Sequence, residues 1–206
     1  MKRRGFLIVL CLLLSACGQR QQQVELPPGA TVLVVGDSLV AGTGATRELS
    51  WPAVLARETG WQVVNAGVPG HRSEDARERL GALLAQYRPD AVIVAIGGND
   101  FLRRVPETQT RENIAAMLDE ARAVSAHVAL VAIPAPSLGA ALFGVLSDHP
   151  LYAALAGEQQ VLLLPDAVAQ TLSRPELRAD SIHANAEGYE YMAELLRKRL
   201  VQAGWL

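Results

Sequence analysis

The stretch Thr31-Val-Leu-Val-Val-Gly-Asp-Ser-Leu39 decides the fold class of this chain. Its first five residues are apolar or β-branched and do not alternate with polar side chains, which is typical of a strand buried on both faces. Glycine, aspartate and serine follow directly, so polar groups lie at the end of this strand. Strands buried on both faces occur almost only in parallel sheets that are covered by helices. The stretch therefore predicts a parallel α/β fold.

The rest of the chain continues this alternation of strand and helix. Buried strands are predicted at residues 62–65, 91–96, 127–133 and 161–164, and helices at residues 50–59, 73–87, 110–124 and 186–202. Five strands alternating with helices indicate a five-stranded parallel sheet with helices on both faces. No internal repeat or second block of composition is present, so we expect one domain. Ligands bind such sheets at the carboxyl ends of the strands, where we expect the functional residues.

The predicted loops contain the parts of an acyl-transfer site. Ser38 follows the first strand, and a serine hydroxyl becomes a nucleophile when a base removes its proton. The segment Asp180-Ser-Ile-His183 supplies a histidine base and, three positions earlier, an aspartate that can hold the imidazole. An oxyanion also needs hydrogen-bond donors. We expect them to be the backbone N–H groups of Ser38 and Gly67 and the side-chain amide of Asn99.

These residues belong to four short segments: Gly-Asp-Ser-Leu at 36–39, Gly67, Gly-Gly-Asn-Asp at 97–100, and Asp180-x-x-His183. In this order they resemble the four sequence blocks of the GDSL or SGNH hydrolases, and the resemblance spans residues 36–189. It implies a flavodoxin-like three-layer α/β/α sandwich. It also implies a catalytic triad of Ser38, Asp180 and His183, with Ser38, Gly67 and Asn99 as the oxyanion hole. The implied reaction is hydrolysis of a carboxylic ester or thioester through an acyl-enzyme, without a cofactor or metal.

One branch of that family is matched more closely than the others. Phe101-Leu-Arg103 and the later Pro134 look like the thioesterase I, lysophospholipase and arylesterase branch. In that branch the loop that begins at Pro134 shapes the substrate pocket, and Phe101 and Leu102, which lie beside Asn99, are expected at the pocket rim. The apolar segment 134–155 could line a groove for an acyl chain or form a short helix on the core, and the sequence leaves both interpretations open.

Two positions near the histidine depart from the family pattern. Ser181 and Ala184 stand where glycine and proline are usual. We expect activity to survive, because serine can adopt the turn at modest cost and alanine loses only rigidity. The loop that carries His183 is expected to be looser.

The sequence contains fewer of the residues that other classes of function require. The glycines after the first strand do not form G-x-G-x-x-G, and no Gly-Lys pair is present, which argues against dinucleotide and P-loop sites. A metal-dependent phosphoesterase is an alternative, because some side chains near these loops have oxygen or nitrogen atoms that can bind a metal ion. They are Asp37, Asn99, Asp100 and His183. A non-catalytic envelope-binding lipoprotein on the same fold is another. We interpret Asp37 as a turn former that binds local amides.

The N-terminus has the pattern of an export signal. Three basic residues at positions 2–4 precede the apolar run 6–14, which is too short to span a bilayer as a helix. The following Leu14-Ser-Ala-Cys17 resembles the bacterial lipobox, which implies that Cys17 is lipidated. We therefore expect a signal peptide at 1–16, a lipidated N-terminus with a polar tether at 17–30, and the hydrolase domain at 31–206. A membrane-anchored lipoprotein of the bacterial cell envelope, facing the periplasm, is predicted.

The composition restricts the partners. The 206 residues carry 19 basic and 21 acidic side chains, and the arginines are scattered, which argues against a nucleic-acid partner. Half of the residues are hydrophobic, which excludes disorder as a description of the whole chain. Both cysteines, Cys11 and Cys17, precede the predicted domain, so no disulfide or cysteine-based metal site is expected in it. We expect a monomer whose partners are a small-molecule or lipid ester substrate and the membrane.

Overall fold

The structure is a computed structural model that describes residues 24–134 and 145–206. The predicted signal peptide at 1–16 and Cys17 lie outside the described residues. Within the two described ranges, no helix combines the length and the apolar content needed to cross a membrane.

A five-stranded parallel sheet forms the centre of the molecule. Its strands are β1 (Thr31–Gly36), β2 (Gln62–Gly67), β3 (Ala91–Ala95), β4 (His127–Val131) and β5 (Leu162–Leu164), in the spatial order β2-β1-β3-β4-β5. Every strand was predicted, and the predicted parallel pairing is confirmed. Strand β4 ends at Val131, two residues earlier than expected. Its neighbour β5 ends at Leu164, which pairs with Val131, so the pairing between the two strands stops there. Strand β1, which lies between β2 and β3, is almost entirely buried, as its unbroken apolar run indicates.

The long helices follow the sequence prediction and the short ones do not. The described helices are α1 (Ser38–Ala41), α2 (Trp51–Thr59), α3 (Ser73–Tyr87), α4 (Gly98–Leu102), α5 (Glu107–Arg122), α7 (Pro150–Gln159), α8 (Ala167–Leu172) and α9 (Ala186–Gln202), with 3₁₀ turns η1 (Arg47–Leu49) and η2 (Pro175–Leu177). Helices α3 and α9 have the predicted bounds. Helix α5 begins three residues early, at Glu107, directly after Pro106, which lies outside the helix with ψ 131°. Helices α1, α4 and α8 are too short to show a hydrophobic period.

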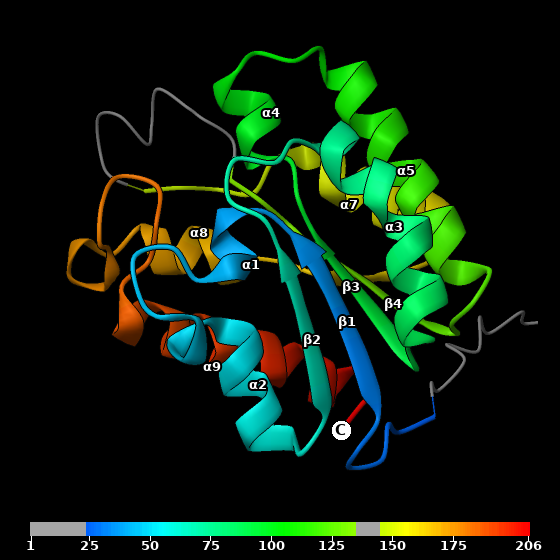
Figure 1. The fold of residues 1–206 in the computed structure, drawn as a ribbon. Coiled ribbons are helices and arrows are strands. Elements are labelled where there is room, and N and C mark those ends of the chain that lie inside the picture. Colours follow the sequence, from blue (N-terminus) through cyan, green and yellow to red (C-terminus); the bar gives the residue numbers. More distant parts are fainter. Residues whose placement is uncertain (1–23, 135–144) are drawn as a thin grey trace, which may run out of the picture.

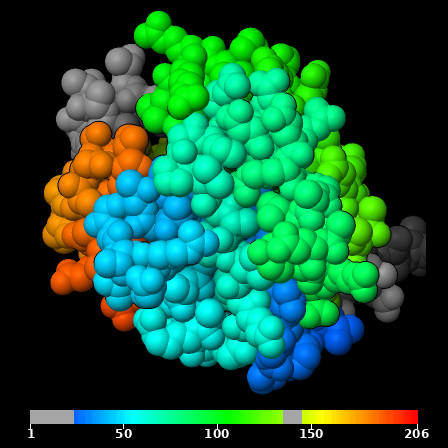
Figure 2. All heavy atoms as spheres, in the orientation of Figure 1, coloured from blue at the N-terminus to red at the C-terminus, as the bar shows by residue number. Residues whose placement is uncertain are grey.

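The helices form a layer on each face of the sheet. Helices α3, α5 and α7 lie together on one face, and α2, α8 and α9 lie on the other (Figure 1). Figure 2 shows atoms of α2 (cyan) and α3 (teal) over the middle of the face turned to the viewer. The arrangement is the predicted three-layer α/β/α sandwich.

The chain packs against the domain before the first strand begins. The Leu26 N–H donates to the Trp205 carbonyl at 2.9 Å, and the Trp61 indole N–H donates to the Leu26 carbonyl at 3.4 Å. His127 Nε2 lies 2.6 Å from the Val24 carbonyl oxygen. Leu26 is buried. The predicted tether is therefore too long, because its last seven residues belong to the packed domain.

Gly188, in the first turn of α9, should not tolerate a side chain. A Cβ on Gly188 would lie 2.1 Å from the carbonyl oxygen of Leu177. Gly188→Ala should lower the free energy of unfolding by about 1–3 kcal/mol, the usual cost of overpacking. Urea unfolding followed by circular dichroism measures this change.

The matched control is Gly157 in α7, where a Cβ would meet nothing within 4 Å. Gly157→Ala should raise the free energy of unfolding by about 0.5–1 kcal/mol, because alanine forms helix more readily than glycine. The same effect in both variants would contradict the packing argument.

Candidate active site

The carboxyl ends of three strands meet at one edge of the sheet. Gly36 at the end of β1 is in register with Gly67 of β2 and with Ala95 of β3. Ser38 and Asn99 lie in the first turn of the helices that follow β1 and β3. The loop before α9 reaches the same edge, because it brings His183 to Ser38. The predicted gathering of these polar residues is confirmed.

Ser38 is placed by a tight junction between β1 and α1. A Cβ on Gly36 would lie 2.3 Å from the Ala95 carbonyl oxygen and 2.3 Å from a methyl carbon of Val40, so only glycine fits there. Asp37 caps α1, and its Oδ1 accepts the Leu39 N–H at 3.0 Å. The interpretation of Asp37 as a residue that binds local amides is confirmed. Ser38 is the first residue of α1, and its backbone N–H has no acceptor among the described residues.

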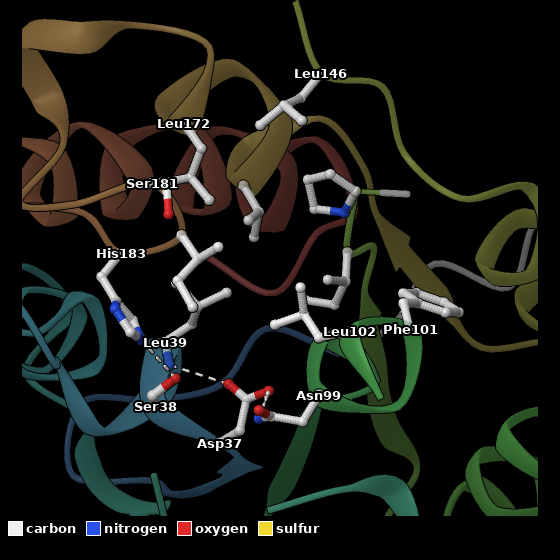
Figure 3. A pocket seen from close by; sticks show the side chains of 15 residues that line it. Asp37, Ser38, Leu39, Asn99, Phe101, Leu102, Leu146, Leu172, Ser181 and His183 are labelled. Atoms are coloured by element: carbon white, nitrogen blue, oxygen red, sulfur yellow. Dashed lines mark hydrogen bonds between the residues drawn. The ribbon is translucent and has the colours of Figure 1, made fainter. Parts of the chain in front are cut away.

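Ser38, His183 and Asp180 are hydrogen-bonded in series. His183 Nε2 lies 2.9 Å from Ser38 Oγ, and His183 Nδ1 lies 2.8 Å from Asp180 Oδ2. Figure 3 shows the Ser38 and His183 side chains pointing toward each other. The other Asp180 oxygen accepts the N–H groups of Ile182 and His183, both at 2.8 Å. Partial desolvation acts to raise the pKa of Asp180, but these hydrogen bonds outweigh it and hold the pKa below its usual value.

The histidine loop is closed by backbone hydrogen bonds. The Ala179 N–H donates to the His183 carbonyl at 3.0 Å, and Arg178 pairs with Ala184 in an antiparallel bridge. Ser181 has no positive φ, so the turn does not require the glycine that is usual in the family. Ala184 is fully buried. That the two departures loosen the loop stays a prediction.

Asn99 and Asp37 share a buried corner beside Ser38. Asn99 Nδ2 donates to the His71 carbonyl oxygen at 3.0 Å and lies 3.4 Å from Asp37 Oδ2. Asp37 is only 2% exposed. Burial raises the pKa of Asp37 from 3.8 to about 6, although the Leu39 N–H and the nearby His183 act to lower it. A buried carboxyl group with a raised pKa therefore lies next to the Asn99 side-chain amide.

The expected role of Gly67 is not compatible with the structure. Its backbone N–H already donates to Asn65 Oδ1 at 3.0 Å. A Cβ on Gly67 would lie 2.3 Å from the Ala41 backbone nitrogen, so the close approach of β2 to α1 explains the glycine. The prediction that the Gly67 N–H faces an oxyanion is wrong, because that hydrogen is bound within its own loop.

A second glycine, Gly70, lies in a turn that is hydrogen-bonded to Asn99. The residues 68–71 form a turn in which the His71 N–H donates to the Val68 carbonyl at 3.2 Å. Gly70 has φ +80° in this turn, and its N–H has no partner among the described residues. The same His71 accepts the Asn99 amide. The Pro69-Gly70 dipeptide is a turn signal that the sequence analysis did not use.

Asp100 ties together three helices. It is 1% exposed and accepts hydrogen bonds from the Ser73 N–H at 2.8 Å, the Ser73 hydroxyl at 2.6 Å and the Thr110 hydroxyl at 3.3 Å. Asp100 thus supports the Asn99 helix through α3 and α5. Within residues 24–134 and 145–206, no group of three or more histidine, cysteine, aspartate or glutamate side chains is placed to hold a metal ion.

An apolar cavity of about 160 Å³ opens beside Ser38 (Figure 3). Phe101, Leu102 and Pro134 line it, as expected. Leu146, from the apolar segment 134–155, also lines it, and five further apolar residues were not predicted: Leu39, Ile133, Val168, Leu172 and Ile182. The two interpretations of segment 134–155 each apply to a part of it, because Pro134 and Leu146 line the cavity while residues 150–159 form α7. Residues 135–144 lie outside the described residues.

A serine, a histidine and an aspartate hydrogen-bonded in series, on the loops of a parallel α/β sheet, are the arrangement of serine hydrolases. Comparison with known sequences defines the group further. The chain belongs to the GDSL-like lipase/acylhydrolase family, whose sequence pattern matches residues 34–191. It is a GDSL-type esterase of the class that acts on ester or thioester bonds.

Three relatives show how far the similarity extends. The chain is 34% identical to the thioesterase 1/protease 1/lysophospholipase L1 of Escherichia coli K12 over 175 residues, which cover 82% of this chain and 83% of that protein. It is 31% identical to the arylesterase of Vibrio mimicus, with 95% and 96% of the two chains covered. The crystal structure of TesA superposes with a TM-score of 0.75 at 30% identity, covering 84% of this chain and 99% of that one.

The buried Asp37 should make stability depend on pH. A carboxyl group whose pKa is about 6 in the folded chain and 3.8 in the unfolded chain destabilises the fold as pH rises through this window. Asp37→Asn removes this dependence. Between about pH 4 and about pH 7, the free energy of unfolding of the variant should therefore rise by on the order of 1–3 kcal/mol relative to that of the parent.

Urea unfolding at several pH values measures this difference. A contact that the asparagine variant loses at every pH shifts its free energy of unfolding by a constant. Such a shift does not change how the difference between variant and parent depends on pH. Parallel pH profiles of parent and variant would contradict the burial argument.

Proposed function

We propose that the chain hydrolyses acyl esters or thioesters through a covalent acyl-enzyme on Ser38, with His183 and Asp180 completing a catalytic triad. The observation that supports this most directly is the position of His183, 2.9 Å from Ser38 Oγ and 2.8 Å from Asp180 Oδ2. The family membership supports the ester or thioester class of substrate.

The reaction proceeds in two steps. His183 Nε2 takes the Ser38 proton as Oγ attacks the carbonyl carbon, and Asp180 holds the imidazole in the tautomer with hydrogen on Nδ1. The imidazolium then protonates the leaving alcohol or thiol, and the C–O or C–S bond breaks. A water molecule, deprotonated by His183, attacks the acyl-enzyme and releases the acid.

The oxyanion is held by three donors in this proposal. The Ser38 N–H has no acceptor among the described residues, and Asn99 Nδ2 makes only a long contact of 3.4 Å to Asp37 with its second hydrogen. Gly70 replaces Gly67 as the third donor, because its N–H has no partner in residues 24–134 and 145–206 and its turn is hydrogen-bonded to Asn99 through His71. Its φ of +80° favours glycine at this position.

The apolar cavity is proposed as the site for the acyl chain. Its walls are formed by Phe101 and Leu102 from α4, Pro134 after β4, and leucines from other segments. Lysophospholipase, thioesterase and arylesterase appear in the names of the relatives, and a substrate with an apolar acyl or aryl group agrees with this lining.

Ser38→Ala should abolish ester hydrolysis and leave the fold intact. Turnover of p-nitrophenyl esters should fall by about 10⁴-fold or more, because the nucleophile is lost. A fluorophosphonate probe should label the parent at Ser38, and turnover should resist EDTA. Loss of activity in EDTA would favour a metal-dependent phosphoesterase, and no labelling or turnover would favour a binding module.

Asn99→Ala should weaken catalysis more than binding. Removal of one oxyanion donor costs about 10²–10³ in kcat, because the donor acts mainly on the transition state. Steady-state kinetics should show this fall with a nearly unchanged KM, and thermal unfolding should show that the fold survives. An unchanged kcat would remove Asn99 from the mechanism.

We also propose that the chain is exported and anchored in a bacterial membrane by acylation of Cys17, facing the periplasm. The basic residues, the short apolar run and the small residues before Cys17 support this. Cys17→Ser should move the protein from the membrane fraction to the soluble fraction. Retention of the unacylated variant in the membrane would contradict the anchor.

A further inference from the structure

The start of the described chain is fixed at the edge of the sheet opposite the active site. Parallel strands all begin at one edge, and the segment before β1 lies there. His127 Nε2 at the start of β4 contacts the Val24 carbonyl oxygen at 2.6 Å. The Leu26 N–H donates to the C-terminal Trp205 carbonyl, and the Trp61 side chain just before β2 donates to the Leu26 carbonyl. Figure 1 shows this segment below the foot of β1, with α1 and α4 at the other end of the strands.

The active site lies at that other end. Ser38 follows the last residue of β1, Asn99 follows β3, and the cavity opens between α1, α4 and α8. A strand of six residues such as β1 spans about 20 Å. A compact body of this size has a radius of gyration of about 16 Å and hence a diameter of about 40 Å. The cavity and Val24 therefore lie on opposite sides of the domain.

The chain between Cys17 and Val24 is short. Six residues separate them, and a fully extended chain of this length reaches about 25 Å at most, whatever its conformation. Turning the cavity mouth onto the bilayer would lift Val24 about one domain diameter, or about 40 Å, above it. A tether of this length cannot span that height.

We propose that the active site of the anchored protein faces away from the membrane that holds it, and that it acts on esters or thioesters that arrive through water. Lipids of the anchoring leaflet are excluded as direct substrates, because their acyl bonds cannot reach Ser38. This inference rests on the proposed esterase activity and on the proposed acylation of Cys17.

The test compares two tether lengths on one vesicle. The acylated protein is reconstituted into vesicles that contain a two-chain lipid with a fluorogenic ester, which does not leave the bilayer. The variant carries about 30 glycine and serine residues inserted between Gln23 and Val24, which gives the tether a root-mean-square length of about 33 Å and a far greater maximum reach. The lipid is chosen as one that unanchored Cys17→Ser protein cleaves in mixed micelles. A water-soluble p-nitrophenyl ester is assayed in parallel.

Both proteins should cleave the soluble ester at the same rate. The long-tether variant should cleave the bilayer ester at least about tenfold faster than the parent. The longer tether raises the effective concentration of the bilayer ester at the active site from near zero. Equal rates of parent and variant on the bilayer ester would overturn the proposal. A variant with Ser38→Ala added is the control for background hydrolysis.

Failure of the premises gives different results. No cleavage of the soluble ester would contradict the esterase function, and mass spectrometry that finds no acyl group on Cys17 would contradict the anchor. Either result also removes the basis of the inference.

Discussion

The structure of the active site depends on the close approach of β1, β3 and α1 at Gly36. The Ala95 carbonyl oxygen and the Val40 side chain both occupy the space in which a Cβ would stand. Because the chain turns there without a side chain, Asp37 is pressed into the interior and Ser38 becomes the first residue of α1. Backbone packing thus sets the position of Ser38, the proposed nucleophile.

His183, the proposed base, reaches this serine from the far end of the chain, so its position depends on the docking of α9. The Gly188 position lies against the Leu177 carbonyl, and the Tyr189 hydroxyl donates to the Thr43 carbonyl at 2.7 Å. Asn185 caps the helix, because its Oδ1 accepts the Gly188 N–H at 2.9 Å. These contacts fix both ends of the loop that holds His183. The proposed triad therefore depends on long-range helix packing, although Asp180 and His183 are neighbours in sequence.

The parts of the site that follow long strands could be predicted, and those that depend on three-dimensional direction could not. Ser38 and Asn99 stand directly after buried apolar runs, which place them at the carboxyl edge. The choice between Gly67 and Gly70 depends on where an N–H points, and this is decided by the Asn65 side chain and a turn. The cavity residues Leu146 and Leu172 come from segments without a hydrophobic period.

The same strand direction that gathers the site also separates it from the N-terminus. A parallel sheet has all strand starts at one edge and all strand ends at the other, so a chain that enters directly at β1 enters opposite the catalytic loops. Here the entry is fastened by Leu26, Trp61 and Trp205, and it cannot swing round the domain without breaking these contacts. Any group attached shortly before Val24 is therefore held behind the active site. The topology that makes the hydrolase also decides from which side its substrate must come.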